Sequence, residues 1–190
     1  MPRPVPARPA PYPARMLIVL CGLPGTGKST LARALARDLR AAHLRVDSVE
    51  AALLNAGLDR VTVEGYAALY AVAADQLSVG LPVIVDLVNS VTATREAWAD
   101  VAARAGATLV NVEVTCNDPA EHRRRVETRH TAPAAHAGRW APPTWADVQA
   151  AAHHYEPWIT PVLRLDTAHA TPAELIGTLR ARLPDAGTLP

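Results

Sequence analysis

The chain is 190 residues long, carries a formal net charge of +1, and contains 49% hydrophobic and 19% charged residues. This length suits one domain with a single buried core. The near-neutral charge provides no basic field, which argues against nucleic acid or an anionic membrane surface as a partner. The two cysteines, Cys21 and Cys116, lack metal-ligand spacing and favour reduced thiols in a cytoplasmic protein. No apolar stretch reaches the roughly 18 residues of a transmembrane helix.

Residues 1–15, MPRPVPARPAPYPAR, form a proline-rich segment with proline at positions 2, 4, 6, 9, 11 and 13. Such a run cannot form a helix and favours an extended arm. It also lacks the apolar stretch of a signal peptide. We expect a disordered tail that precedes a folded domain at residues 16–190, with docking to a partner as the alternative function of the arm.

Short apolar runs alternate with amphipathic stretches along the rest of the chain. MLIVLCG (16–22) is typical of a strand buried on both faces, and Leu31, Leu35 and Leu39 then form one stripe of a helix. In chain order the sequence predicts strand 16–22, helix 28–41, strand 44–47, two helical stretches of which the second spans about 64–79, strand 81–86, helix 93–105, strand 108–116, helix 118–129, an irregular segment 130–143, helix 144–156, strand 162–166 and helix 172–183. This alternation predicts an α/β fold, a three-layer αβα sandwich with a five-stranded parallel sheet.

Three chemically distinctive residues follow or end predicted strands. Gly22, Asp47 and Asp86 all lie at expected carboxyl ends. Parallel α/β sheets bind ligands at the carboxyl ends of their strands, so we expect these residues to converge on one site.

The segment from Gly22 to Ser29, GLPGTGKS, matches the phosphate-binding pattern G-x-x-x-x-G-K-[ST]. Its glycines allow tight turns that aim backbone N–H groups at phosphate oxygens, and the following helix adds the positive end of its dipole. Lys28 is expected to bridge the β- and γ-phosphates and the Ser29 hydroxyl to ligate Mg²⁺. The predicted nucleotide-binding residues are Gly22, Leu23, Pro24, Gly25, Thr26, Gly27, Lys28, Ser29 and Thr30. The expected nucleotide is ATP, although no adenine-reading motif is identifiable.

Other features separate a kinase from a switch or a motor. The guanine-reading N-K-x-D motif is absent, and Asp86 is followed by Leu87 rather than by a second carboxylate that would activate water. A phosphotransferase needs a carboxylate to take a proton from the acceptor, and arginines to offset charge on the moving group. Asp47 supplies the first, and Arg125 and Arg129, four positions apart on a predicted helix, supply the second. The irregular segment after them suits a short lid, at about residues 125–143.

CGLPGTGKSTLARALARDL, Asp47, VIVD and the later R-x-x-x-R together resemble the small P-loop kinases, a group that includes AAA_33-like proteins, zeta toxins, gluconate kinase, polynucleotide kinases and chloramphenicol phosphotransferase. The resemblance covers roughly residues 16–183. It implies a P-loop NTPase fold, with Asp47 as general base, Asp86 ordering Mg²⁺ through water, and Arg125 and Arg129 as lid arginines. Many such kinases carry D-x-x-R after the second strand, whereas this chain has Glu50 in the place of that arginine. The departure suggests a neutral or cationic acceptor.

These observations predict an ATP- and Mg²⁺-dependent kinase acting on a hydroxyl of a small molecule, such as an antibiotic or secondary metabolite. A nucleotide-binding regulatory or toxin-like protein that gates a partner, or a nucleic-acid end kinase, are the alternatives. Asp47 and Asp86 also suit helix caps. The aromatic residues near the lid favour packing over ligand stacking, and Asn89 and Arg95 are weaker candidates for the acceptor pocket. The aromatic residues in question are Trp140, Trp145, Tyr155 and Trp158.

Overall fold

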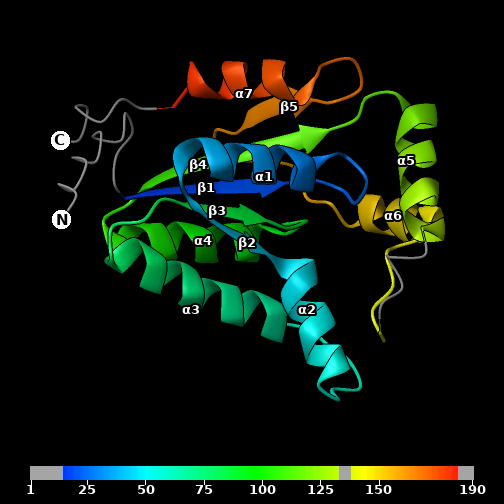
Figure 1. The fold of residues 1–190 in the computed structure, drawn as a ribbon, viewed down its shortest axis with the longest axis horizontal. Coiled ribbons are helices and arrows are strands. Elements are labelled where there is room, and N and C mark those ends of the chain that lie inside the picture. The colour runs from blue at the N-terminus through cyan, green and yellow to red at the C-terminus, as the bar shows by residue number, and fades with distance from the viewer. Residues whose placement is uncertain (1–14, 133–137, 184–190) are drawn as a thin grey trace, which may run out of the picture.

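The computed structural model describes residues 15–132 and 138–183, so the proline-rich arm up to residue 14 and residues 133–137 of the expected lid lie outside the described residues. The strands are β1 (Met16–Cys21), β2 (Ala42–Arg45), β3 (Val83–Asp86), β4 (Thr108–Thr115) and β5 (Leu163–Asp166). The helices are α1 (Lys28–Leu39), α2 (Val46–Asn55), α3 (Glu64–Ser78), α4 (Thr92–Ala105), α5 (Pro119–Thr131), α6 (Trp145–His153) and α7 (Pro172–Arg180). The strands form one parallel five-stranded sheet in the order β2-β3-β1-β4-β5, which confirms the predicted fold class (Figure 1).

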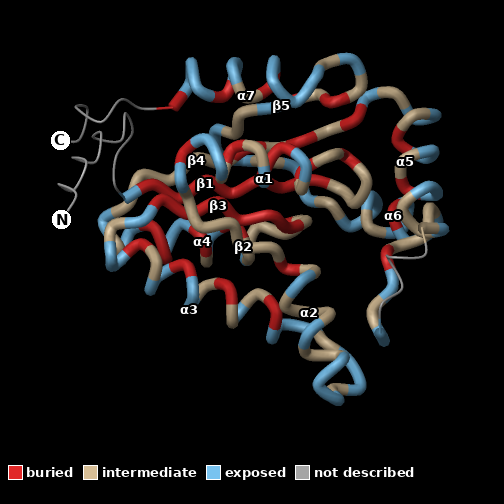
Figure 2. The backbone as a smooth tube through the Cα atoms, viewed as in Figure 1, coloured by how far each residue is buried: buried red, intermediate tan, exposed pale blue. Residues whose placement is uncertain are grey.

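The central strand β1 is buried on both faces, and its alternate side chains enter two separate cores. Met16, Ile18 and Leu20 pack with the leucines of α1 and α7 on one face. Leu17 and Val19 pack with α3 and α4 on the other, where Trp98 is fully buried. The buried backbone accordingly runs through the middle of the molecule, between exposed helix faces (Figure 2). This continuous apolar run is what a parallel sheet covered by helices on both sides requires.

The carboxyl ends of the strands all point toward the same edge of the sheet. Figure 1 shows α5 and α6 beyond that edge, with α2 leaving the sheet beside it. The edge is therefore enclosed by the loop after β1, the start of α2 and the side of α5. Among the described residues, no helix has the length and apolar character needed to cross a bilayer.

One predicted boundary is wrong at the point that matters most for the site. The second strand was expected to end at Asp47, but β2 ends at Arg45, whose pairing partner is the last residue of β3, Asp86. Helix α2 begins directly at Val46, so Asp47 lies in its first turn. A carboxylate in the first turn is favoured by the helix dipole, which explains why the helix begins earlier than the apolar pattern indicates.

Candidate functional site

The loop between β1 and α1 is a tight backbone turn that only glycine can make at several points. Gly22, Gly25 and Gly27 have φ angles of 135°, 85° and 94°. A Cβ atom on Gly22 would lie 2.2 Å from the backbone oxygen of Val114, so this residue must be glycine for β1 and β4 to approach as they do. The loop therefore has the backbone form expected of a phosphate cradle.

Lys28 begins α1 and folds back under the loop. Its side chain is buried, with 7% of the residue exposed, and its Nζ donates a hydrogen bond of 2.8 Å to the carbonyl oxygen of Leu23. Burial lowers the pKa of Lys28 below its ordinary value, and the charges of Asp86 and Asp47 only partly oppose this. A buried ammonium with one carbonyl partner is short of anionic ligands, which the oxygens of a phosphate would supply.

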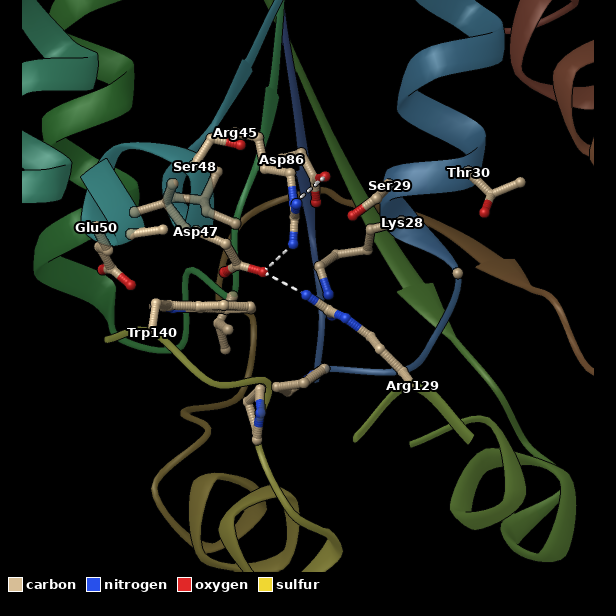
Figure 3. Close-up of a pocket in the computed structure, with 18 of the residues that line it drawn as sticks. Lys28, Ser29, Thr30, Arg45, Asp47, Ser48, Glu50, Asp86, Arg129 and Trp140 are labelled. Carbon is tan, nitrogen blue, oxygen red and sulfur yellow. Dashed lines mark hydrogen bonds and ion pairs between the residues drawn. The ribbon is translucent and has the colours of Figure 1, made fainter. Parts of the chain in front are cut away.

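Asp86, at the end of β3, carries a buried oxygen without a hydrogen-bond partner. Its Oδ2 lies 3.6 Å from Nε2 of His43 and 3.8 Å from Nε of Arg45, and makes no hydrogen bond to either. Burial raises the pKa of the Asp86 carboxyl, but the polar side chains of His43 and Ser29 and the charges of Lys28 and Arg45 outweigh it, so the net pKa lies below the ordinary value. Figure 3 shows the Ser29 hydroxyl directed toward this carboxylate.

A hydroxyl beside a carboxylate oxygen that makes no hydrogen bond is an arrangement that suits Mg²⁺, which prefers oxygen ligands. Within residues 15–132 and 138–183, no group of three or more His, Cys, Asp and Glu side chains could hold a metal by itself. The residues present therefore fit a metal that takes the rest of its ligands from nucleotide phosphate and water, with Ser29 and Asp86 as the protein side.

Asp47 projects from α2 into the same site, where two arginines hold one of its oxygens. Arg129 of α5 donates to Oδ2 at 2.9 Å, and Arg45 donates to the same atom (Figure 3). The other oxygen, Oδ1, has no hydrogen-bond partner among the described residues. The helix N-cap is Arg45, so Asp47 does not serve as the cap. The carboxylate is instead oriented by charge, with one oxygen left open.

Arg125 lies on the same helix as Arg129 but is held differently. Its Nε donates to Glu121 and its other two nitrogens donate to the hydroxyl and carbonyl oxygens of Thr167, at 2.7, 2.8 and 2.9 Å. The Thr167 hydroxyl also lies 2.7 Å from the carbonyl oxygen of Thr26. Thr167 thus joins α5 to the phosphate loop, and Arg125 has two of its five N–H donors left over.

These residues surround a cavity of about 710 Å³. Its walls are the phosphate loop with the start of α1, the start of α2, the end of β3, and α5 with the segment after it. The polar and aromatic side chains that line it include Lys28, Ser29, Arg33, Arg45, Asp47, Glu50, Tyr66, Asp86, Arg125, Arg129 and Trp140. A second hollow of about 210 Å³ shares Gly27, Thr30 and Arg125 with the first and continues past Thr167 to Leu31 and Leu175. The two hollows meet over the loop.

The structure thus brings the predicted residues Lys28, Ser29, Asp47, Asp86, Arg125 and Arg129 to one cavity. Sequence reasoning missed Arg45 and Thr167, which hold Asp47 and Arg125 in place. It also missed His43, which lies beside Asp86, and Tyr66, which lines the cavity. Arg45 and Thr167 end or follow strands at the same sheet edge, and that placement was the available signal.

The aromatic candidates divide between the cavity and packing. Trp140 lines the cavity. Trp145 packs edge-on against His122, and Tyr155 and Trp158 cover the guanidinium of Arg95.

The weaker acceptor candidates do not line the cavity. Arg95 is buried and donates to the carbonyl oxygens of Asn89, Ser90, Glu156 and Pro157, so it ties two loops together. Its role is structural.

Comparison with solved structures places this site in a known fold. A Chloroflexus aurantiacus protein provisionally named a kinase superposes with a TM-score of 0.70 at 24% identity, covering 90% of this chain and 100% of that one. Chaetomium thermophilum Kti12 in complex with ADP-AlF3 gives 0.67 at 19% identity (88% and 99% covered), and Mycobacterium tuberculosis APS kinase CysC with AMPPNP and APS gives 0.61 at 21% (89% and 97%).

No curated protein sequence matches the chain significantly. The AAA_33 family model, described as an AAA domain, matches residues 17–141. The chain has a kinase-like P-loop NTPase fold, and it belongs to the AAA_33 family.

Proposed function

We propose that this protein is an ATP-dependent, Mg²⁺-requiring kinase that transfers the γ-phosphoryl group to a hydroxyl of a small molecule. The observation that carries the proposal is the Asp47 carboxylate, which faces the cavity beside Lys28 with Oδ2 held by two arginines and Oδ1 open. A switch or motor needs no such acid at this position, whereas a phosphotransferase needs one to orient and deprotonate an alcohol.

In the proposed reaction the acceptor hydroxyl donates its hydrogen bond to Oδ1 of Asp47. Its oxygen attacks the γ-phosphorus in line, the bond from that phosphorus to the β–γ bridging oxygen breaks, and ADP leaves. The hydroxyl proton passes to Asp47. Lys28 and Arg129 offset the charge on the transferring group, and Arg129 is well placed because it already lies beside Asp47 at 2.9 Å.

The smaller hollow supports one orientation of the bound nucleotide, with its base in the hollow and its phosphates over the loop. It adjoins the phosphate loop at Gly27 and Thr30 and has apolar walls at Leu31 and Leu175. A base bound there would leave its phosphates running over the loop toward Asp47. Arg125, held by Thr167 at the junction, would direct its spare N–H donors at the phosphates.

Mg²⁺ would bind between Ser29 and Asp86, where it would neutralise charge on the β- and γ-phosphates. The acceptor would occupy the larger cavity, whose volume of about 710 Å³ lies within the ordinary range of small-molecule sites. A lid at about residues 125–143 that excludes water remains part of the proposal, since water competes with the acceptor for the phosphoryl group.

The test is to incubate the protein with ATP and Mg²⁺ and a panel of sugars, nucleosides, amino sugars, aminoglycosides and amphenicols, and to search for a gain of about 80 Da, the mass of one transferred phosphoryl group. Asp47→Asn should keep ATP binding and lose about 10²–10⁴-fold in transfer, and Lys28→Ala should lose both. Asp75→Asn, an equal charge change on the exposed face of α3, is the control. Full transfer by Asp47→Asn would rule out its assignment as base.

A further inference from the structure

The larger cavity has two chemically different ends. Figure 3 shows Lys28, Ser29 and Arg129 on one side of Asp47, and Glu50 and Trp140 on the other. The first end holds the phosphate loop and the side chains expected to bind phosphate. With the phosphates at the first end, the part of the acceptor that does not react would contact the second end.

Glu50 is a half-buried carboxylate without a partner. It lines the cavity from α2, and it makes no hydrogen bond or ion pair to any residue in the described part of the chain. None of the cavity's five cations pairs with Glu50. Arg45 and Arg129 are paired with Asp47, and Arg33 is exposed on α1, on the phosphate-loop side. Lys28 donates to the carbonyl oxygen of Leu23, and Arg125 is held by Glu121 and Thr167. A carboxylate withdrawn from water without a cation is unfavourable unless a ligand supplies one.

The room that Glu50 occupies is provided by a glycine. Gly65, in the first turn of α3, is buried, and a Cβ atom there would lie 2.8 Å from Cγ and 3.2 Å from Oε1 of Glu50. A glycine inside a helix weakens it relative to alanine. Here the missing side chain is what lets the carboxylate lie against α3 at the cavity wall. Burial raises the pKa of Glu50, as does the charge of Asp47, which agrees with an acid that has no compensating cation.

Trp140 offers a second feature that binds cations. Its ring lines the same cavity and already lies 5.5 Å from the guanidinium of Arg129. An aromatic face and a carboxylate together bind an ammonium group better than either does alone, because both present negative potential to it.

From these contacts we infer that the acceptor is an amino alcohol, a hydroxylated compound whose protonated amine binds Glu50 and Trp140 while its hydroxyl lies at Asp47. Asp47 and Glu50 are three positions apart on α2 and so share one face, with Cβ atoms about 5–6 Å apart. The two side chains are therefore close enough for one small acceptor to contact both. This inference rests on the proposed function, because it assigns the reacting hydroxyl to Asp47.

The test measures binding separately from turnover. The protein loaded with the non-hydrolysable analogue AMPPNP and Mg²⁺ is titrated, by ligand-observed NMR or calorimetry, with matched trios on one scaffold. These are glucosamine, glucose and glucuronate, and also trans-4-aminocyclohexanol, 1,4-cyclohexanediol and 4-hydroxycyclohexanecarboxylate. Within a trio the amine should bind about tenfold or more tightly than the neutral compound, as expected for a charge-assisted contact, and the carboxylate should bind most weakly.

Two variants locate the effect. Glu50→Gln should remove the preference for the amine, and Gly65→Ala, which displaces the carboxylate but keeps it, should reduce the preference. Both should leave the affinity for AMPPNP unchanged. Glu96→Gln, which removes the same charge from the exposed face of α4, is the control. Amines that bind no better than their neutral partners, or a preference that survives Glu50→Gln, would overturn the inference.

Turnover with ATP then separates this inference from the proposed function. If amines bind through Glu50 but gain no phosphoryl group, the amine-binding site is supported and the proposed kinase activity is contradicted. Transfer that favours the neutral or carboxylate members would uphold the kinase and contradict the amine site.

Discussion

Gly22→Ala tests the backbone geometry from which the nucleotide site is built. The new methyl group would meet the backbone oxygen of Val114 at 2.2 Å, and φ at this residue is 135°. The sparsely populated backbone conformation costs about 1–3 kcal/mol for a residue with a side chain. Forcing β4 aside in a packed core costs about 1–3 kcal/mol more. The free energy of unfolding should therefore fall by about 2–6 kcal/mol, a large part of the roughly 5–15 kcal/mol of a typical domain.

Two other glycines provide matched controls, because each exchange adds the same methyl group. At Gly80 φ is 82° but no atom lies within 4 Å of the added Cβ, so Gly80→Ala should cost about 1–2 kcal/mol from the backbone alone. Gly177, inside α7, also has open space and an ordinary φ, so Gly177→Ala should stabilise by about 0.5–1 kcal/mol. Urea unfolding gives the three values and calorimetry gives the ATP affinity, which only Gly22→Ala should lower. Equal losses for Gly22→Ala and Gly80→Ala would refute the close approach of the loop to β4.

Three further predictions concern the charges and the hydroxyl around the loop. Because burial depresses the pKa of Lys28 and phosphate restores it, nucleotide binding favours the protonated form. The affinity should be constant at pH values below the depressed pKa and should fall as the pH rises through it, with proton uptake in calorimetry. An affinity that stays constant up to the ordinary lysine pKa of 10.5 would contradict this. Thr167→Val removes the buried hydroxyl that joins Arg125 to the loop, so unfolding free energy should fall by about 1–3 kcal/mol; an unchanged urea midpoint would count against it. Arg129→Ala should slow phosphoryl transfer by roughly 10³-fold. Arg123 is exposed on the same helix, so Arg123→Ala should leave the rate of transfer unchanged. Equal rates in the two variants would show that Arg129 takes no part in the mechanism.

The features of the fold and site that follow from local patterns were predictable. The G-x-x-x-x-G-K-[ST] segment identifies the loop because backbone conformation and phosphate chemistry leave few residue choices there. The apolar runs identify the parallel sheet. Because the carboxyl ends of parallel strands share one edge, the position of Asp86 at the end of its strand predicts that it lies near the loop. Each of these depends on residues close together in sequence.

The orienting contacts depend on residues far apart, and the sequence pattern does not contain them. Arg129 and Asp47 are 82 positions apart, and the Thr167 hydroxyl meets the carbonyl oxygen of Thr26 across 141 positions. The start of α2 was misplaced because LRVD suits either a strand or a helix start, and its pairing with β3 decides between them. Whether Trp140 packs or lines a cavity likewise depends on tertiary placement.

The path of the γ-phosphoryl group is the most direct test of the proposed kinase. With ATP labelled in its γ-phosphoryl oxygens, the label in acceptor and in inorganic phosphate is followed by mass spectrometry, for the native chain and for Asp47→Asn. We expect the native chain to place the label on the acceptor. Asp47→Asn should bind ATP within about twofold of the native affinity, because the proposal assigns Asp47 to the acceptor hydroxyl rather than to the nucleotide, yet it should transfer almost none. Label that reaches inorganic phosphate at the same rate with and without every acceptor, or normal transfer by Asp47→Asn, would contradict the assignment.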